Sequence, residues 1–369
     1  MPGTSVPLEW HGRSVDAYVP ERLVAGTQFS APTVRAAARA EGTLAAMGDR
    51  LGGLEVPARL LLRAEGIASS RIEGVEAPLD AIAVASADDL VAGDAGWVAD
   101  NLKAVTAALA HRGRLRAADI KQWHRLLMVH SSLEPIHIGA WRDRIGWIGG
   151  PSPVHAAHVA SPPQMLDELM RDLITYANSD GDDPVTQAAL VHAQFETIHP
   201  FADGNGRIGR ILIGWVLCRR LQLAVAPPVS IGFARDIGGY LSTLTLYRQV
   251  GPDPWVRWFA EAVEAAAGRV AWTLAAIAEL EASWPNQLKG VRRDSATHKL
   301  LAHLVAHPAL DVATAATLVG VSEQAARVAL VELADRGVLR EVATAVPTDR
   351  PGRPRRWWVA GDLLDLLGR

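Results

Sequence analysis

The chain has little cysteine, little net charge and no long apolar run, and each of these absences excludes a class of protein. It has one cysteine, Cys218, so an internal disulfide is excluded, and helical spacing with Ile211 and Trp215 predicts a buried packing residue rather than a nucleophile. The net charge of -3 provides no overall positive field for nucleic acid or membrane. No apolar run approaches the roughly 20 residues that span a bilayer. The first ten residues lack the charged start and apolar centre of a signal peptide. We therefore expect a cytoplasmic protein with no membrane partner.

Lysine is scarce as well. Four lysines beside abundant arginine and alanine indicate a GC-rich bacterial coding bias. With 369 residues, 49% of them hydrophobic, the chain can form a sizeable core and two domains or more. Most of it shows helical periodicity, whereas residues 1–32 contain scattered glycine, proline and aromatic residues and predict an irregular arm.

The densest chemistry lies in residues 199–210, which read His-Pro-Phe-Ala-Asp-Gly-Asn-Gly-Arg-Ile-Gly-Arg. Asp183 and Pro184 start a helix whose apolar spacing ends at His199. A second apolar period begins near Arg207, so the glycine turn precedes the N-terminus of another helix.

The N-terminus of the second helix is a favourable place for an anion to bind. The first amides of a helix have no acceptor within the helix, and glycines allow the preceding backbone to approach a phosphate closely. Arg207 and Arg210 add positive charge from the first turn. Asp203 is an oxygen ligand suited to Mg2+, and His199 can act as a general base at neutral pH. The alternative is an ordinary loop, with a histidine that complements a helix dipole and arginines that are simply solvated. The combination of all these residues favours an active site.

These residues match the motif of the Fic (filamentation induced by cAMP) family, H-x-F-x-D-G-N-G-R-x-x-R, at every specified position. The resemblance implies a helical bundle with a small β-hairpin, called the flap, and an activity that moves AMP from ATP to a hydroxyl of a target protein. His199 would deprotonate that hydroxyl, Asp203 would hold Mg2+, and Phe201 would anchor the loop. The remaining residues of the motif would bind phosphate: the amides of Gly204, Asn205 and Gly206, the side chain of Arg207, and Arg210 at the γ-phosphate.

A second resemblance lies upstream. Ser69, Glu73 and Gly74 match the family's inhibitory motif, [ST]-x-x-x-E-[GN]. It implies that Glu73 pairs with Arg210 and occupies the space of the γ-phosphate. For an isolated acid before a glycine, the alternative is a solvated side chain that ends a helix.

Two further regions fit the family. Residues 139–150 alternate glycines with aromatic and β-branched residues and predict a hairpin, in which Arg142, Trp147 and Ile148 would form the flap that docks the target. A packed surface hairpin is compatible with this interpretation. Tyr240 is the candidate neighbour of the nucleotide base, with a core aromatic as its alternative.

The segment 296–369 resembles a winged helix-turn-helix. Helices over 297–306, 312–319 and 322–334 would precede a two-stranded wing over 338–342 and 356–359. Arginines of the wing suit phosphate contacts: Arg350, Arg353, Arg355 and Arg356. A protein-docking or dimerisation domain is the alternative, and Glu323 and Glu332 weaken the case for DNA.

We thus expect a mostly α protein with an N-terminal helical region (1–95), a Fic core (96–283) and a winged helix (296–369). The leading function is a self-inhibited protein adenylyltransferase with Mg2+ as cofactor and a target protein, or the chain itself, as acceptor. One alternative is a hydrolase that removes AMP through the same pocket. The other is a DNA-binding regulator with a nucleotide-sensing Fic domain. A homodimer is left open.

Overall fold

The computed structural model describes residues 3–51, 55–88, 93–342 and 355–368. In this part of the chain helices predominate, and the strands form two hairpins and one three-stranded sheet. The expected mostly helical fold is confirmed. None of the helices described there combines the length and apolarity that crossing a membrane requires.

The N-terminal residues form a β-hairpin. Strands β1 (Thr4–Trp10) and β2 (Arg13–Val19) pair in antiparallel fashion, and the turn residues His11 and Gly12 both have positive φ, at 47° and 75°. Two positive φ values are typical of the tight turn that matches strand twist. The expected irregular arm over residues 1–32 is therefore wrong in this part. Pro7 counts against a central strand, but a two-stranded ribbon has only edge strands, which tolerate proline.

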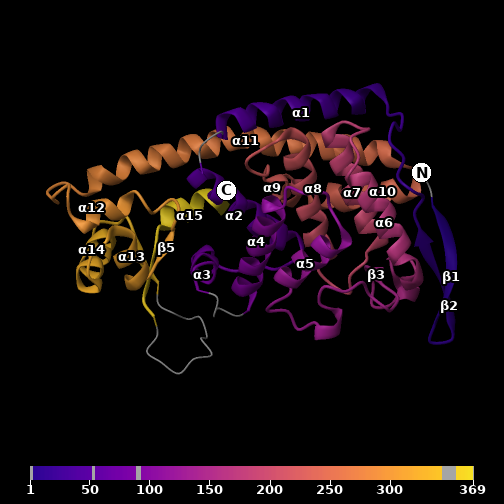
Figure 1. Cartoon of the computed structure of the whole chain (residues 1–369), viewed down its shortest axis with the longest axis horizontal. Helices are drawn as coiled ribbons and strands as arrows, with labels where there is room; N and C mark the ends of the chain where they lie inside the picture. Colours follow the sequence, from indigo (N-terminus) through magenta and orange to yellow (C-terminus); the bar gives the residue numbers. More distant parts are fainter. Residues whose placement is uncertain (1–2, 52–54, 89–92, 343–354, 369) are drawn as a thin grey trace.

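A helical bundle makes up the larger part of the molecule (Figure 1). In chain order its helices are α1 (Ala31–Leu51), α2 (Glu55–Ile72), α3 (Leu79–Ala85), α4 (Asp94–Ala110), α5 (Ala117–Leu127), α6 (Leu166–Ala177), α7 (Pro184–Ile198), α8 (Asn205–Leu221), α9 (Val229–Arg235), α10 (Ile237–Gln249) and α11 (Pro252–Gln287). Between α5 and α6 lie the short elements η1 (Pro135–His137), β3 (Trp147–Ile148), η2 (Pro153–His155), β4 (His158–Val159) and η3 (Pro163–Met165).

Helix α11 runs along the molecule to the C-terminal elements, and α1 lies beside its first half (Figure 1). The two helices are parallel, because the Ser30 N–H donates to Asp253 at 2.7 Å and Arg39 pairs with Glu264 at 3.2 Å. The expected boundary near residue 95 does not interrupt the packing. One hydrophobic cluster joins Leu44 of α1 to the centre of the bundle.

Helix α7 is the centre of this bundle. All of its residues are buried, as expected for a helix that is mostly apolar all round. It packs against α8, where Cys218 is buried and its thiol pKa is raised by burial to about 12. Cys218 is thus a packing residue, as the sequence predicted.

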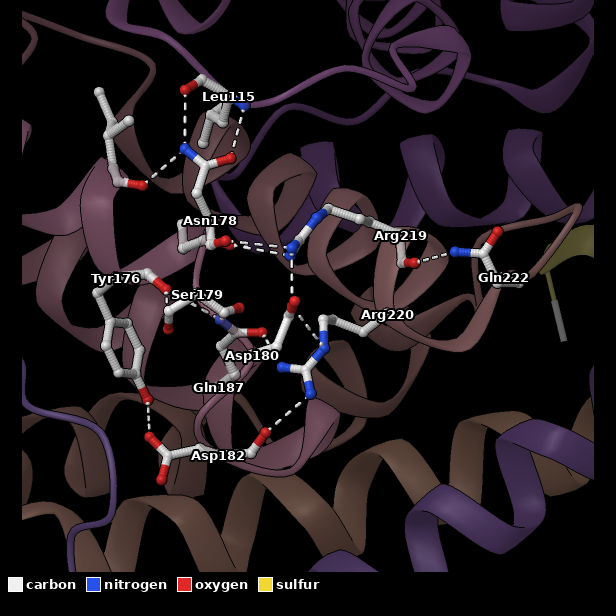
Figure 2. A network of polar contacts seen from close by, with 12 residues as sticks. Leu115, Tyr176, Asn178, Ser179, Asp180, Asp182, Gln187, Arg219, Arg220 and Gln222 are labelled. Carbon is white, nitrogen blue, oxygen red and sulfur yellow. Dashed lines mark hydrogen bonds and ion pairs between the residues drawn. The ribbon is translucent and has the colours of Figure 1, made fainter.

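A polar network fixes the outer ends of α7 and α8 (Figure 2). Arg219 donates to the carbonyl of Asn178 at 3.2 Å and to Asp180 at 2.7 Å, and Arg220 donates to the carbonyl of Asp182 at 3.0 Å. Gln187 of α7 donates to the Ser179 carbonyl at 2.7 Å. These bonds hold the end of α8 against the start of α7, which sets how the two helices meet at their other ends.

The C-terminal unit comprises α12 (Ala296–Leu301), β5 (Ala309–Leu310), α13 (Val312–Val319), α14 (Glu323–Asp335), β6 (Arg340–Val342), β7 (Trp357–Val359) and α15 (Gly361–Gly368). Its strands are antiparallel in the order β5-β7-β6. The helices and the last two strands lie where the sequence predicted them, apart from a shorter first helix. Its core continues into α2, because Leu60 and Ala64 share a cluster with Trp358 and Leu363.

Candidate active site

His199 lies at the junction of α7 and α8. It ends α7 in the left-handed region, with φ 52° and ψ 61°, and its N–H donates to the Phe195 carbonyl at 2.8 Å. This backbone conformation is uncommon for a residue other than glycine. It turns the imidazole toward the N-terminus of α8, where the side chain is 21% exposed.

Arg142 stabilises this conformation. Its guanidinium donates to the carbonyls of His199 at 2.8 Å, Arg144 at 2.8 Å and Ser161 at 2.5 Å, and its own N–H donates to the Pro200 carbonyl at 2.8 Å. Arg142 is 2% exposed. The prediction that Arg142 belongs to the target-facing flap is therefore corrected, because its donors are used on backbone carbonyls at the end of α7.

The expected anion site has a preformed backbone. Gly204 caps α8 with φ 75°, so the amides of Asn205, Gly206 and Arg207 are the first of that helix and have no acceptor within it. The Asn205 side chain accepts from the Phe201 N–H at 2.8 Å and donates to the Phe201 carbonyl at 2.9 Å. Phe201 is fully buried, which confirms its predicted role as the anchor of the loop.

The Glu73 side chain lies against the N-terminus of α8. Helix α2 ends at Ile72, and the Glu73 carboxylate that follows accepts from Nη2 of Arg210 at 2.7 Å. The same carboxylate oxygen lies so close to Gly206 that a β-carbon there would overlap it. Ser69 completes the contact, since its hydroxyl accepts from Nε of Arg210 at 2.9 Å and its carbonyl from Nη2 at 2.8 Å. Gly74 allows the turn with φ 75°.

Burial and neighbouring charges change the pKa of three side chains at the site. Burial opposes ionisation of Glu73, but Arg210 outweighs it and lowers the pKa of Glu73. Burial, and then the charge of Glu73, raise the pKa of Glu196 to about 8, so Glu196 is neutral at pH 7. Burial, followed by Arg142 and His158, lowers the pKa of His199 to about 3. The imidazole is therefore neutral at pH 7, as a general base must be.

Both arginines of the motif retain unused donors. Within the described part of the chain, Nη1 of Arg210 and Nε of Arg207 are buried and have no hydrogen-bond partner. Burial lowers the pKa of Arg207, whereas the Glu73 carboxylate outweighs burial and raises the pKa of Arg210. Buried cationic donors without partners are costly, so the site favours an anion larger than a carboxylate.

Asp203 fits Mg2+ only together with a nucleotide. Its side chain is exposed, and Oδ1 accepts from the Gly204 N–H at 2.6 Å. Among the residues that the structure describes, no three His, Cys, Asp or Glu side chains converge on a point that could hold a metal. Mg2+ is usually bound by one or two carboxylates plus phosphate oxygens, which is the set that Asp203 and a polyphosphate would supply.

Tyr240 is buried beside Arg210, since burial raises the pKa of its hydroxyl and the charge of Arg210 opposes that rise. It is 3% exposed, its hydroxyl lies 2.9 Å from Nε2 of His192, and its ring stacks on Phe233 at 5.0 Å. Its predicted place beside the nucleotide base stays a prediction, with a core aromatic as the alternative.

The predicted hairpin is present but longer than expected. Trp147 pairs with Val159 and Ile148 with His158, so it spans residues 147–159 instead of closing within 139–150. Trp147 is 38% exposed, and its role in docking a target stays a prediction.

Two arginines of the predicted wing are paired with acids. Arg356 contacts Glu341 at 2.5 Å, and Arg355 lies 3.8 Å from Asp311 and 3.7 Å from Asp88. Arg350 and Arg353 lie outside the described residues. The pairs reduce the positive charge that the wing presents to DNA.

Two titratable residues next to the site, His124 and Glu196, were not predicted from the sequence. His124 is fully buried on α5, and its Nε2 lies 3.1 Å from the Asp203 carbonyl. Glu196 lies on α7, with Oε2 3.9 Å from Nδ1 of His199. A signal existed for both, because each is a titratable residue at an apolar helix position. His124 falls in the row formed by Ile120 and Leu127.

Comparison with known sequences agrees with this geometry. The family model described as Fic/DOC matches residues 114–217. The protein adenylyltransferase Fic of Drosophila ananassae is 32% identical over 166 residues, which cover 44% of this chain and 31% of the relative. That of Drosophila mojavensis is 29% identical over 209 residues, which cover 56% of this chain and 38% of the relative. The chain thus spans about a third of the length of these relatives.

Solved structures show the same fold. A Fic family protein from Desulfovibrio desulfuricans aligns with a TM-score of 0.59 at 21% identity, over 92% of this chain and 98% of the other. Residues 134–508 of Fic-1 from Caenorhabditis elegans align with a TM-score of 0.50 at 20% identity, over 66% of this chain and 74% of the other.

Proposed function

This chain contains a domain of the Fic/DOC family, and from that premise we propose that it is a self-inhibited protein adenylyltransferase. It transfers AMP from ATP to a Ser, Thr or Tyr hydroxyl of a target protein or of the chain itself. The observation that carries the proposal is the position of the Glu73 carboxylate, which lies against Gly206 and Arg210 where an anion would bind.

The chemistry follows from the site. The target oxygen attacks the α-phosphorus, the bond from that phosphorus to the bridging oxygen of the β-phosphate breaks, and pyrophosphate leaves. The hydroxyl proton passes to the neutral imidazole of His199. The first amides of α8 and the free donors of Arg207 and Arg210 stabilise the phosphate charge. Asp203 would hold Mg2+, which supplies additional positive charge to the phosphates when bound.

Inhibition follows from the ion pair. As long as Glu73 holds Arg210, a γ-phosphate must displace a carboxylate from a bond of 2.7 Å and approach its negative charge. The flap over residues 147–159 would pair with an extended target segment, with Trp147 exposed beside it.

The test uses ATP labelled at the α-phosphate, Mg2+ and cell lysate. Label on protein should grow in Glu73→Gly relative to the native chain and disappear in Glu73→Gly with His199→Ala, because the double variant lacks the base. Calorimetry should show that the double variant still binds ATP. Absence of label in every variant would contradict transferase activity, and loss of AMP from a modified protein would then support the hydrolase.

The C-terminal unit is proposed to be a winged helix that binds a protein rather than DNA. The pairing of Arg355 and Arg356 with acids supports this choice. Salt-dependent affinity of the full chain for duplex DNA would instead favour the regulator. Sedimentation of the same sample tests for a homodimer.

A further inference from the structure

His124 connects three segments of the site. The residue projects from the apolar face of α5 and is fully buried. Its ring stacks on Phe201 at a centroid distance of 3.9 Å and an angle of 8°. On one side it meets the backbone of Gly139, which leads to Arg142, and on the other the backbone of Asp203.

The hydrogen bonds of the ring define its tautomer. The Gly139 N–H donates to Nδ1 at 2.8 Å, so Nδ1 carries no proton. Nε2 lies 3.1 Å from the Asp203 carbonyl, which can only accept, so Nε2 must carry the proton. The ring therefore donates to Asp203 in its neutral form.

The hydrogen bond from His124 to the Asp203 carbonyl also affects the orientation of the Asp203 side chain. A peptide group is planar, so the Asp203 carbonyl and the Gly204 N–H rotate together. The Gly204 N–H donates to Oδ1 of Asp203 at 2.6 Å, and the orientation of the peptide therefore decides where this carboxylate points. Gly204 has φ 75° and packs closely against Leu127 and Met128, so the hydrogen bond from His124 acts together with this packing to hold the peptide.

We propose that His124 is a positioning residue that aims the Asp203 carboxylate, and the helix amides after it, at the phosphates of the bound nucleotide. This inference rests on the proposed function, since it assigns His124 to the Mg2+–nucleotide site. A core residue with no such role would contribute through the ring and its packing alone.

Two substitutions separate these roles in the Glu73→Gly background. Both remove the ring. His124→Gln places an amide near the former Nε2 and retains a donor for the Asp203 carbonyl. His124→Asn places its oxygen near the former Nδ1, retains the acceptor for Gly139 and loses the bond to Asp203. A purely packing role predicts the same defect in both.

The measurements are the affinity for ATP by calorimetry across a Mg2+ series, and the Mg2+ concentration that gives half-maximal AMP transfer. His124→Asn should require about 10-fold more Mg2+, the size expected when a partner of a metal ligand is lost, and His124→Gln should stay within about 2-fold of the parent. The same shift in both variants, or none in either, would overturn the proposal.

Two further controls keep the test decisive. Nitrogen-15 NMR of the parent reads the ring of His124 without any substitution there, and a proton on Nδ1 would overturn the proposal even if both variants failed to fold. If the parent transfers no AMP, the proposed function fails. The Mg2+ dependence of ATP binding, measured by calorimetry, still decides the role of His124.

Discussion

Arginines face carboxylates in two regions of this protein, and the two regions are built in opposite ways. Beside α2 the Arg210 side chain is 1% exposed, and it holds Glu73 at 2.7 Å while one of its donors has no partner in the described chain. In the C-terminal unit Arg340 is 59% exposed and holds Asp80 at 2.6 Å. The distances are alike, so distance does not separate the pairs.

The burial of the arginine separates the two pairs, because Arg210 is buried and Arg340 is exposed, whereas Glu73 at 38% is more exposed than Asp80 at 23%. A buried cation with a free donor has lost its water and gains much from a suitable anion, whereas an exposed pair is screened by solvent and contributes about 0–1 kcal/mol. The first pair is therefore suited to control ligand binding, whereas the second connects segments of the fold.

Substitution of Glu73 by glycine should raise AMP transfer by about 10- to 100-fold, because a charged hydrogen bond of about 1.5–3 kcal/mol no longer opposes the phosphate. Incorporation of label under initial-rate conditions measures the effect. Glu76→Gly is the matched control, since Glu76 is 65% exposed and pairs with Arg71 at the surface. An equal rise in both variants would remove the distinction between an acid held by a buried arginine and an acid of a surface pair.

Substitution of Arg210 by lysine in the Glu73→Gly background should weaken ATP binding by about 10-fold, because lysine keeps the charge but loses the planar fork. Calorimetry measures the dissociation constant. Arg356→Lys is the control, and we expect it to leave ATP affinity unchanged. Retention of full affinity in Arg210→Lys would mean that the fork does not contact phosphate.

The free energy of unfolding should be greatest near pH 6.5, the ordinary pKa of histidine in an unfolded chain. Burial lowers the pKa of His124 and His158 to about 4 and of His192 and His199 to about 3, so below pH 6.5 the unfolded chain takes up protons that the folded chain refuses. Burial raises the pKa of Glu65 to about 7 and of Glu196 to about 8, so the stability from their protonated forms is lost as pH rises through those values.

Denaturant titrations from pH 4 to pH 9 measure this profile. Glu196→Gln should flatten the decline on the alkaline side, because glutamine stays neutral. A maximum at pH 8 or above would contradict the assignment of neutral buried acids around α7.

Substitution of Asp80 by alanine should change the free energy of unfolding by no more than about 1 kcal/mol and leave ATP affinity unchanged, since its partner Arg340 is largely exposed. Denaturation of the double variant with Arg340→Ala gives the coupling between the two. A coupling well above that size would place this pair in the same class as Arg210 and Glu73.

The parts of the site that are contiguous in the chain can be predicted from local sequence patterns. The cap at Asp183, the glycine at 204 and the apolar periods on either side fix a helix, a turn and a second helix, because caps and turns depend on neighbouring residues. The order of His199, Asp203 and Arg207 then follows from spacing alone. The paired motif at Glu73 was also readable, though only through family resemblance.

The tertiary structure decided which distant residues meet these ones. Arg210 and Glu73 are 137 positions apart, and His124 and Asp203 are 79 apart. No local pattern encodes such a contact, because it depends on how α2, α5 and α8 pack. Burial likewise changed the roles that the residue types suggested. The side chains of Arg142 and Tyr240 are buried, and burial raises the pKa of Glu196 to about 8. Spacing along the chain fixes local geometry, but desolvation and long-range contacts exist only once the helices have packed.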